Sequence, residues 1–226
     1  MTKNKALVIF SGGQDSTTCL YWAIDKFGQN NVKALSFDYG QRHAIELESA
    51  KKIAQLASVP HQVIPINTFN AIQNNALTGN IEVENTTGEN GLPNTFVPGR
   101  NLIFITFAAA IAYQDKITDL ITGVAQTDYS GYPDCRENTI ESLQKTIALG
   151  MEYEVKIHTP LMHLNKQQTV KLAEKIGAME AMAYTHTCYN GQFPPCGECP
   201  ACLLREKGFK AAGVEDPLLT RANANV

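Results

Sequence analysis

Five short apolar runs alternate along the chain with longer stretches in which apolar residues recur at helical spacing. The runs at 6–10, 32–37, 62–66, 117–123 and 155–161 predict β-strands. The stretches at 19–27, 43–58, 102–113, 137–149 and 165–176 predict helices, the last of them capped by Asn165. We expect Gly28, Gly150 and Gly177 to end three of these helices. Alternation of strands and helices indicates a parallel sheet with right-handed crossovers.

The pattern therefore predicts an α/β fold, a doubly wound parallel sheet of five strands, for residues 1–180. Residues 181–226 are expected to form a smaller C-terminal region packed on this domain. Open parallel sheets bind ligands at the carboxyl ends of their strands. Chemistry is therefore expected in the segments that directly follow each strand.

Composition and charge narrow the function classes. The 226 residues carry a formal net charge of −3, in an ordinary globular composition large enough for a sizeable core. A protein that grips a nucleic-acid backbone usually carries a basic surplus, so we expect no nucleic acid as a partner. No signal peptide of the usual layout precedes the first strand, and no apolar run approaches the ~20 residues of a membrane span. We expect a cytoplasmic protein without a membrane partner.

The turn after the first strand, residues 11–16, reads Ser-Gly-Gly-Gln-Asp-Ser. Paired glycines let the backbone approach a ligand closely, and the helix that follows presents unpaired N–H groups with a partial positive charge. The turn is thus an anion site, most naturally for phosphate. It is neither a Walker loop nor a G-x-G-x-x-G dinucleotide turn. The alternative is an ordinary glycine turn with Asp15 as a capping acid.

Residues 67–98 are rich in Asn, Thr and Gly and are longer than a normal connection. Such segments are usually disordered or act as lids and binding loops, and we expect a loop beside the active site. It leads into Arg100, at the start of the helix at 102–113, where the helix dipole disfavours a positive charge. We therefore expect the Arg100 guanidinium to meet a carboxylate or phosphate, with a surface salt bridge as the alternative.

The segment after the fourth strand, residues 123–135, is polar and contains two carboxylates and two tyrosines. At the edge of a sheet, such groups can read a heterocycle by hydrogen bonds and stacking. Asp128 and Asp134 are the candidate hydrogen-bond acceptors, and Tyr129 and Tyr132 are the candidate stacking groups. A solvated connection without a ligand is the alternative.

Four of the six cysteines gather near the C-terminus as C-x7-C-x2-C-x2-C: Cys188, Cys196, Cys199 and Cys202. Four thiolates fit a closed tetrahedral zinc site, which is structural because no position is left for water or substrate. An iron–sulfur cluster uses the same ligands, and unmetallated thiols are a third alternative. We expect one structural Zn²⁺ per chain.

The segments together resemble a known family. Ser-Gly-Gly-x-Asp-Ser after a first buried strand resembles the pyrophosphate loop of the PP-loop ATP-pyrophosphatase superfamily. With the segments at 37–41, 97–101 and 123–132 and the cysteine tail, nearly the whole chain is similar to the 7-cyano-7-deazaguanine synthases, the queuosine-pathway family of that superfamily. Only residues 67–95 lack a recognisable anchor.

This resemblance implies a ligase that converts 7-carboxy-7-deazaguanine, ammonia and ATP into a nitrile through adenylated acid and amide intermediates. It implies that 1–180 is the ATP-binding and catalytic domain and that 181–226 binds zinc. The residues implied to bind ATP are Phe10, Ser11, Gly12, Gly13, Gln14, Asp15 and Ser16.

The resemblance also assigns chemical roles. Asp15, Ser16 and Arg100 are the candidate catalytic residues, with Mg²⁺ neutralising the phosphates and Arg100 on the substrate carboxylate or the α-phosphate. We expect no glutaminase domain, and therefore free ammonia as the nitrogen source. We expect a homodimer, from the family and from base rates.

Two other function classes stay open at this stage. A PP-loop enzyme that modifies tRNA, by thiolation or amino-acid ligation, would need an RNA surface, for which the charge gives no support. A zinc-stabilised nucleotide-binding module without catalysis is less consistent with an acid placed inside the phosphate loop.

Overall fold

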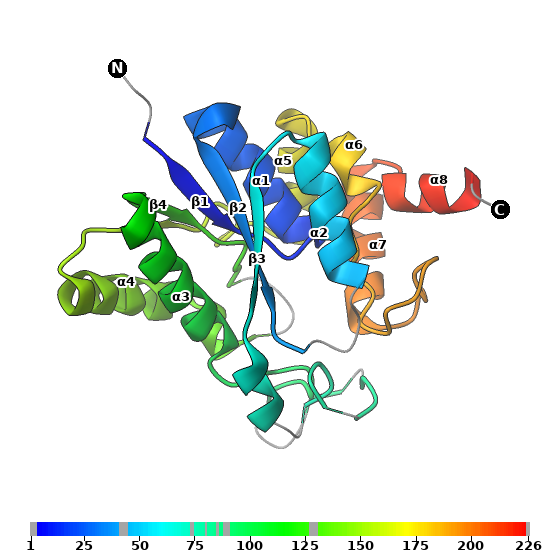
Figure 1. Ribbon diagram of the computed structural model, residues 1–226. Helices are drawn as coiled ribbons and strands as arrows, with labels where there is room; N and C mark the ends of the chain where they lie inside the picture. The colour runs from blue at the N-terminus through cyan, green and yellow to red at the C-terminus, as the bar shows by residue number, and fades with distance from the viewer. Residues whose placement is uncertain are drawn as a thin grey trace.

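The computed structural model describes residues 4–40, 45–72, 75–79, 81–84, 86–87, 91–126 and 131–224. Its centre is one parallel sheet in the order β3-β2-β1-β4-β5 (Figure 1). The strands are β1 (Ala6–Ile9), β2 (Val32–Asp38), β3 (His61–Pro65), β4 (Asp119–Ile121) and β5 (Lys156–His158). The predicted α/β class and doubly wound sheet are confirmed.

The order in which the chain adds strands to the sheet reverses at β1. Ala6 lies opposite Val32 of β2 on one side and opposite Asp119 of β4 on the other. The chain builds β2 and β3 outward on the first side and then returns to add β4 and β5 on the second. The crevice at the carboxyl ends of β1 and β4 is therefore the switch point, where open α/β sheets bind their ligands.

Helices cover both faces of the sheet (Figure 1). Helices α1 and α2 pack on one face, and α3 and α4 pack on the other. The helices are α1 (Gln14–Phe27), α2 (Ile45–Leu56), α3 (Arg100–Asp115), α4 (Glu137–Met151), α5 (Lys166–Lys175), α6 (Met179–Met182), α7 (Pro200–Ala212) and α8 (Pro217–Ala224). Short 3₁₀ turns lie at η1 (Gln29–Asn31), η2 (Asn67–Ala71) and η3 (Pro133–Cys135).

Strand β1 is apolar throughout because both of its faces are buried. Ala6 and Val8 join the core beneath α1 and α2, whereas Leu7 joins the core beneath α3 and α4. Successive side chains of a strand point to opposite faces, so a central parallel strand needs apolar residues at every position. This packing fixes the position of the turn that follows β1.

Several predicted helix ends are observed. Gly28 and Gly177 adopt φ angles of 84° and 73° after α1 and α5. Asn165 caps α5, where its side chain accepts from the Gln168 N–H and the Gln168 side chain accepts from the Asn165 N–H. This reciprocal pair is a capping box.

The prediction that Gly150 ends the fourth helix is wrong. Helix α4 continues to Met151, and its C-cap is Glu152, with a φ of 47°. The Tyr153 N–H closes the end by donating to the Ala148 carbonyl. A glycine ends a helix only where the backbone needs a positive φ, and here Glu152 supplies that conformation.

Helices α7 and α8, which the hydrophobic pattern did not predict, complete the C-terminal region. Helix α7 packs closely on α5, since a Cβ at Gly208 would lie 2.9 Å from the Lys166 Cβ. Buried Arg205 of α7 donates from Nε and Nη2 to the two carboxylate oxygens of Asp216, at 2.6 and 2.8 Å. Among the described residues, no helix is both long enough and apolar enough to cross a membrane.

Candidate active site

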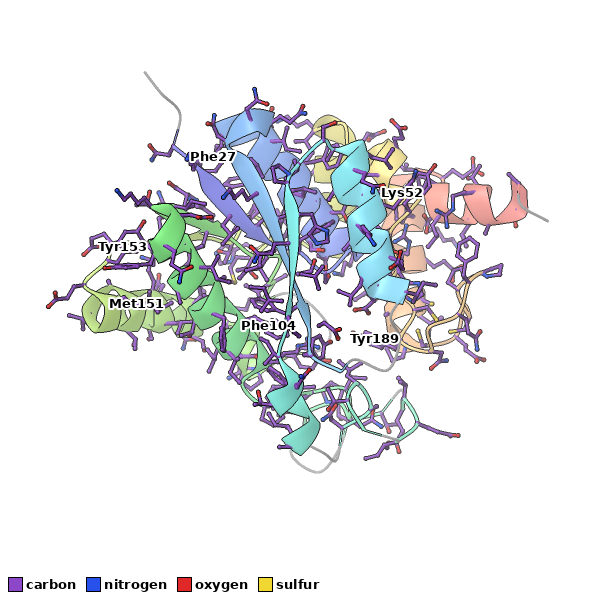
Figure 2. The ribbon with its side chains drawn as sticks, viewed as in Figure 1. Phe27, Lys52, Phe104, Met151, Tyr153 and Tyr189 are labelled. Atoms are coloured by element: carbon purple, nitrogen blue, oxygen red, sulfur yellow. The ribbon has the colours of Figure 1, made fainter. Side chains whose placement is uncertain are left out.

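A cavity of about 290 Å³ lies at the carboxyl ends of the central strands. The turn after β1, the end of β2, the segment after β4 and the C-terminal segment all contribute to its wall. Phe104 of α3 and Tyr189 of the C-terminal segment, both labelled in Figure 2, reach it from distant parts of the chain. The predicted ATP residues in its wall are Phe10, Ser11, Gly13, Gln14, Asp15 and Ser16.

Gly12 lies behind this wall and fixes the turn. Its φ is +80°, and a Cβ there would lie 2.6 Å from both the Ala50 nitrogen and the Glu46 carbonyl oxygen of α2. The His186 N–H donates to the Gly12 carbonyl at 3.0 Å. Only glycine satisfies both the conformation and the space, so the turn is held between α2 and the C-terminal segment.

The two serines of the turn tie it to the first turn of α1. The Ser11 and Ser16 hydroxyls lie 3.1 Å apart, and the Ser11 N–H donates to the Ser16 Oγ at 3.2 Å. The Gly13 N–H in turn donates to the Ser11 Oγ at 3.3 Å. Helix α1 begins after Gly13, which has no side chain to cap it. The first amides of a helix have no intrahelical partners and favour an anion.

Asp15 forms an ion pair that the sequence analysis missed. The Lys166 Nζ lies 2.6 Å from the Asp15 Oδ2, and both side chains are largely buried. The other carboxylate oxygen, Oδ1, is buried without a hydrogen-bond partner among the described residues. The capping box at Asn165 fixes where α5 begins and makes Lys166 the first residue of that helix. The sequence therefore predicts the place of Lys166 in α5, but not its contact with Asp15.

A hard cation bound to the Asp15 Oδ1 would supply the partner that this buried atom lacks among the described residues. Mg²⁺ prefers oxygen ligands and usually binds one or two carboxylates together with phosphate oxygens. The neighbouring amides of α1 would hold those phosphates. The residues present therefore fit a magnesium–phosphate complex at this end of the cavity.

Arg100 enters the cavity from the N-terminus of α3. Burial opposes its charge, but its neighbours outweigh that effect and raise the pKa of Arg100 above its ordinary value. Those neighbours are Tyr39, Tyr132, Tyr189 and Asp134. The guanidinium is thus a permanent positive charge in a largely enclosed, aromatic wall.

Glu46 of α2 also lies in the cavity wall, and the sequence analysis did not predict this. Burial raises the pKa of its carboxyl to about 7, although Arg100 acts in the opposite direction. Burial also raises the pKa of Tyr189 well above its ordinary value. Glu46 lies on a predicted helix and Tyr189 lies beside a predicted metal ligand, and neither position predicts a place in this cavity.

The candidate ring-binding residues divide into three groups. Tyr132 lies in the cavity wall, and its hydroxyl is 2.6 Å from the Thr95 hydroxyl. Asp134 is buried and accepts from the Asn101 N–H at 2.9 Å, so one of its oxygens caps α3. Asp128 and Tyr129 lie outside the described residues.

The long segment at 67–98 reaches the site through a few described residues. Leu77 lies in the cavity wall, and Thr95 bonds to Tyr132. Cys135 also lines the cavity. Cys19 of α1 is fully buried.

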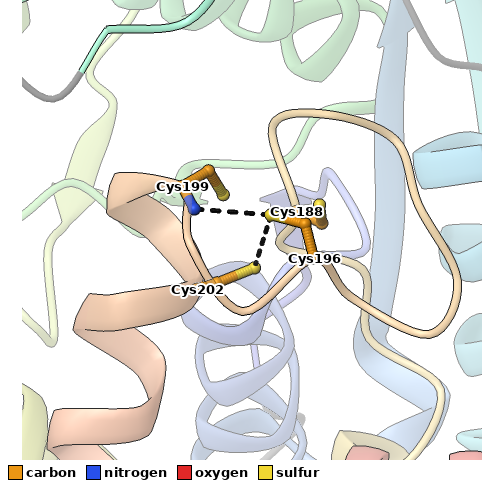
Figure 3. Close-up of side chains that lie close together, drawn as sticks. All are labelled: Cys188, Cys196, Cys199 and Cys202. Carbon is orange, nitrogen blue, oxygen red and sulfur yellow. Dashed lines mark hydrogen bonds between the residues drawn. The ribbon is translucent and has the colours of Figure 1, made fainter.

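The four C-terminal cysteines come together in one cluster (Figure 3). Their sulfurs all lie within 4.8 Å of one another, and those of Cys196 and Cys202 are 3.8 Å apart. A tetrahedral site with Zn–S bonds of about 2.3 Å has sulfurs about 3.8 Å apart. A hydrogen bond from Cys202 lowers the pKa of Cys199 below its ordinary value. The cluster therefore fits a tetrahedral metal ion.

Comparison with known proteins places the chain in a family. The family model "Queuosine biosynthesis protein QueC" matches residues 5–213. Proteins named 7-cyano-7-deazaguanine synthase are 60% identical in Chromobacterium violaceum, over 97% of this chain and 95% of the relative, and 60% identical in Laribacter hongkongensis, over 96% and 94%. The synthase of Bacillus subtilis is 51% identical, over 93% and 95%. The chain therefore belongs to the QueC family of queuosine biosynthesis proteins.

Proposed function

We propose that this protein converts 7-carboxy-7-deazaguanine and ammonia into 7-cyano-7-deazaguanine, using ATP. The observation that carries the proposal is the turn at 11–16, whose unpaired helix amides and Asp15 lie together at the switch point of the sheet. Relatives of nearly the same length bear the name of this synthase. A phosphate-binding turn in the wall of a cavity is what such a reaction requires.

The reaction must first make a carboxylate electrophilic. A carboxylate oxygen attacks the α-phosphorus of ATP, the bond to the β-phosphate oxygen breaks, and pyrophosphate leaves. Ammonia then attacks the acyl carbon, AMP leaves and a proton is lost, which gives the amide. A second adenylation, on the amide oxygen, allows loss of AMP and of the nitrogen-bound protons to give the nitrile.

The protein's contribution is position and charge, because no step needs an enzyme nucleophile. The amides of the turn and the Ser11 and Ser16 hydroxyls would hold the leaving pyrophosphate. Asp15, oriented by Lys166 through its Oδ2, keeps its Oδ1 for Mg²⁺, which would neutralise the phosphates. Arg100 is positioned to bind the substrate carboxylate or the α-phosphate as charge develops.

The groups that read the deazaguanine ring remain proposals. Tyr132 is suited to stacking, since its ring lies in the cavity wall. We propose that Asp128 and Tyr129, which follow β4 in sequence, also take part in ring recognition. Asp134 has one oxygen engaged with α3, so we propose that it mainly supports Arg100, with ring recognition as a secondary role.

We infer that the cysteine cluster holds a structural Zn²⁺, in a C-terminal region at 181–226 that packs on the catalytic domain at 1–180. Four sulfur donors would fill the tetrahedron, leaving no position for activated water. The thiolates of Cys188, Cys196, Cys199 and Cys202 would then order the loop that places Tyr189 in the cavity.

We further propose that the enzyme acts on free small molecules in the cytoplasm as a homodimer. The net charge of −3 supports a small-molecule substrate over a nucleic acid. Light scattering of the purified protein tests the dimer.

The test is incubation with ATP, 7-carboxy-7-deazaguanine and ammonium, followed by mass spectrometry. Conversion to the nitrile, with AMP formed only when the acid is present, is the expected result. Asp15→Asn should abolish turnover while leaving the circular dichroism spectrum and the zinc content unchanged. AMP that forms only after tRNA is added would overturn the proposal in favour of a tRNA-modifying enzyme.

A further inference from the structure

A second cavity, of about 420 Å³, lies against the same phosphate turn. Its wall is built from α7 and from described residues of the segment at 84–95. Its volume is within the range of about 300–1,000 Å³ that is typical of small-molecule sites. The two cavities share five wall residues: Gln14, Asp15, Tyr132, Thr187 and Tyr189.

The shared wall is where two ligands could meet. Gln14 is 3% exposed, and its Nε2 has no hydrogen-bond partner among the described residues. The Asp15 Oδ1 beside it is also buried without one. A buried polar atom without a partner is costly, so these two atoms point to ligands that complete them.

The rest of the second cavity suits a flat heterocycle. Pro93, Ala201 and Leu204 give it apolar sides. Its wall also holds a few polar groups that can form hydrogen bonds. These are the Gln14 amide and the Thr95 and Tyr132 hydroxyls, which lie 2.6 Å apart. Apolar walls with a small number of convergent hydrogen-bonding groups are typical of sites for heterocyclic ligands.

The same cavity is poorly suited to a triphosphate. Three cations line it: Lys166 is already paired with Asp15, Arg205 is paired with Asp216, and Lys207 is exposed. Arg100, by contrast, lines only the first cavity. The positive charge of Arg100 therefore favours the nucleotide phosphates in the first cavity over the second.

We propose that the second cavity is the acceptor site, in which the 7-deazaguanine ring lies between α7 and the segment that ends at Thr95. Its carboxylate is directed at the shared wall, where Gln14 donates to it and the α-phosphate of ATP lies on the other side. This inference rests on the proposed function and names the site of its second substrate. Sequence analysis placed ring recognition only after β4, and the structure adds α7.

The metal cluster becomes part of substrate recognition as a consequence. Helix α7 begins directly after Cys199, its N-cap, and carries Cys202 in its first turn. Loss of the metal would release this wall while leaving the turn before α1 in place. Metal removal should therefore weaken binding of the acid more than binding of ATP.

The experiment narrows the cavity from each side. In Leu204→Trp, on α7, and in Thr87→Trp, on the exposed segment opposite, the KM for 7-carboxy-7-deazaguanine should rise at least about tenfold, since small misfits in a pocket are worth 10- to 200-fold. The Kd for ATP, measured by calorimetry without the acid, should change less than about twofold. Leu219→Trp, at a residue of α8 that is 43% exposed and lines neither cavity, is the matched control and should change neither constant.

Two outcomes would overturn the inference. Active Leu204→Trp and Thr87→Trp variants with an unchanged KM for the acid would exclude this cavity as its site. A loss of ATP affinity equal to the loss for the acid would place the nucleotide there instead. Failure of the wild-type protein to convert the acid would be different, since it would remove the proposed function itself.

Discussion

Two glycine turns in this molecule each lead into a helix, and they are held by opposite means. The turn at 11–13 precedes α1 and contains Gly12 at a φ of +80°, whereas the turn at 196–199 precedes α7 and contains Gly197 at +76°. A Cβ at Gly12 would lie 2.6 Å from two backbone atoms of α2, whereas a Cβ at Gly197 would meet nothing within 4 Å. The first turn is shaped by protein packing, and the second is shaped by its cysteines.

The difference teaches where each turn's rigidity comes from. Packing can hold the phosphate turn ready before any ligand arrives, which suits a site that works by preorganised amides. The cysteine turn has few apolar neighbours, since its core cluster contains little beyond the cysteines themselves. We therefore expect its order to depend on a bound ion, and substitutions at both turns can test this.

The largest effect is expected on removing the metal. Structural zinc contributes on the order of 10 kcal/mol to the folding of small sites, and the region around residues 188–202 has no comparable core of its own. Cys199→Ser should lose zinc, measured by elemental analysis, and should become sensitive to protease near residue 190. A zinc-free variant that resists protease and keeps full activity would contradict the metal-dependent turn.

The next largest effect concerns Arg205, a buried residue of α7 that ties this helix to Asp216. Its guanidinium forms two hydrogen bonds to Asp216 and one to Thr185, in a site where it is 4% exposed. Arg205→Met should lower the free energy of unfolding by about 3–5 kcal/mol because Asp216 stays buried without its partner. Urea unfolding measures the loss, and adding Asp216→Asn should recover part of it. A double variant no more stable than Arg205→Met would show that the lost charge pair is not the cause.

Gly12→Ala tests the packed turn. The left-handed backbone and the contact with α2 together should lower the free energy of unfolding by about 2–5 kcal/mol. Turnover should fall further than stability alone explains, since the amides around Gly13 would shift. The measurements are thermal unfolding and AMP formation, and a variant with wild-type turnover would disprove the close-packed turn.

A pH effect of similar size or less is expected at Glu46, whose carbonyl oxygen a Cβ at Gly12 would meet. The folded protein raises the pKa of this carboxyl from 4.5 to about 7. Between these values the folded state keeps a proton that the unfolded chain has released, so stability falls as the pH rises through this window. The full shift corresponds to about 3 kcal/mol, and partial exposure of the side chain reduces it.

Unfolding free energies at pH 5 and pH 8 measure this effect. Glu46→Gln should remove the part of the pH dependence that lies between pH 4.5 and about 7. The variant should therefore gain stability relative to wild type at pH 8. An unchanged pH profile would show that the carboxyl titrates normally.

The smallest effect is expected for Gly197→Ala. With open space around the Cβ, only the positive φ is unfavourable, which costs about 1–2 kcal/mol. Zinc content and KM for the acid should be close to those of wild type. A loss as large as that of Gly12→Ala would remove the contrast between the two turns.

The strands were predictable from sequence because both faces of a parallel sheet are buried, which leaves uniform apolar runs such as 6–10 and 32–37. The turn at 11–16 was predictable because its signal is local: two glycines, two serines and an acid lie within six residues. The cysteine cluster was predictable for the same reason. Each signal lies within one short segment.

What could not be predicted depends on contacts between distant segments. Lys166 reaches Asp15 across 151 residues, and its role follows from the packing of α5 beside α1. Glu46 looks like any acid in the first turn of a helix until α3 brings Arg100 to it. Helix α7 was missed because its pattern begins inside the cysteine motif. The predicted end of α4 at Gly150 was wrong because a glycine can also lie within a helix.

The most direct test is a crystal structure with Mg²⁺ and an ATP analogue that carries a methylene bridge between the α- and β-phosphates. The account predicts that the β- and γ-phosphates lie on the main-chain amides of residues 12–16, with the Asp15 Oδ1 directed at the metal. Phosphates bound in the second cavity, or anywhere away from the turn before α1, would contradict it.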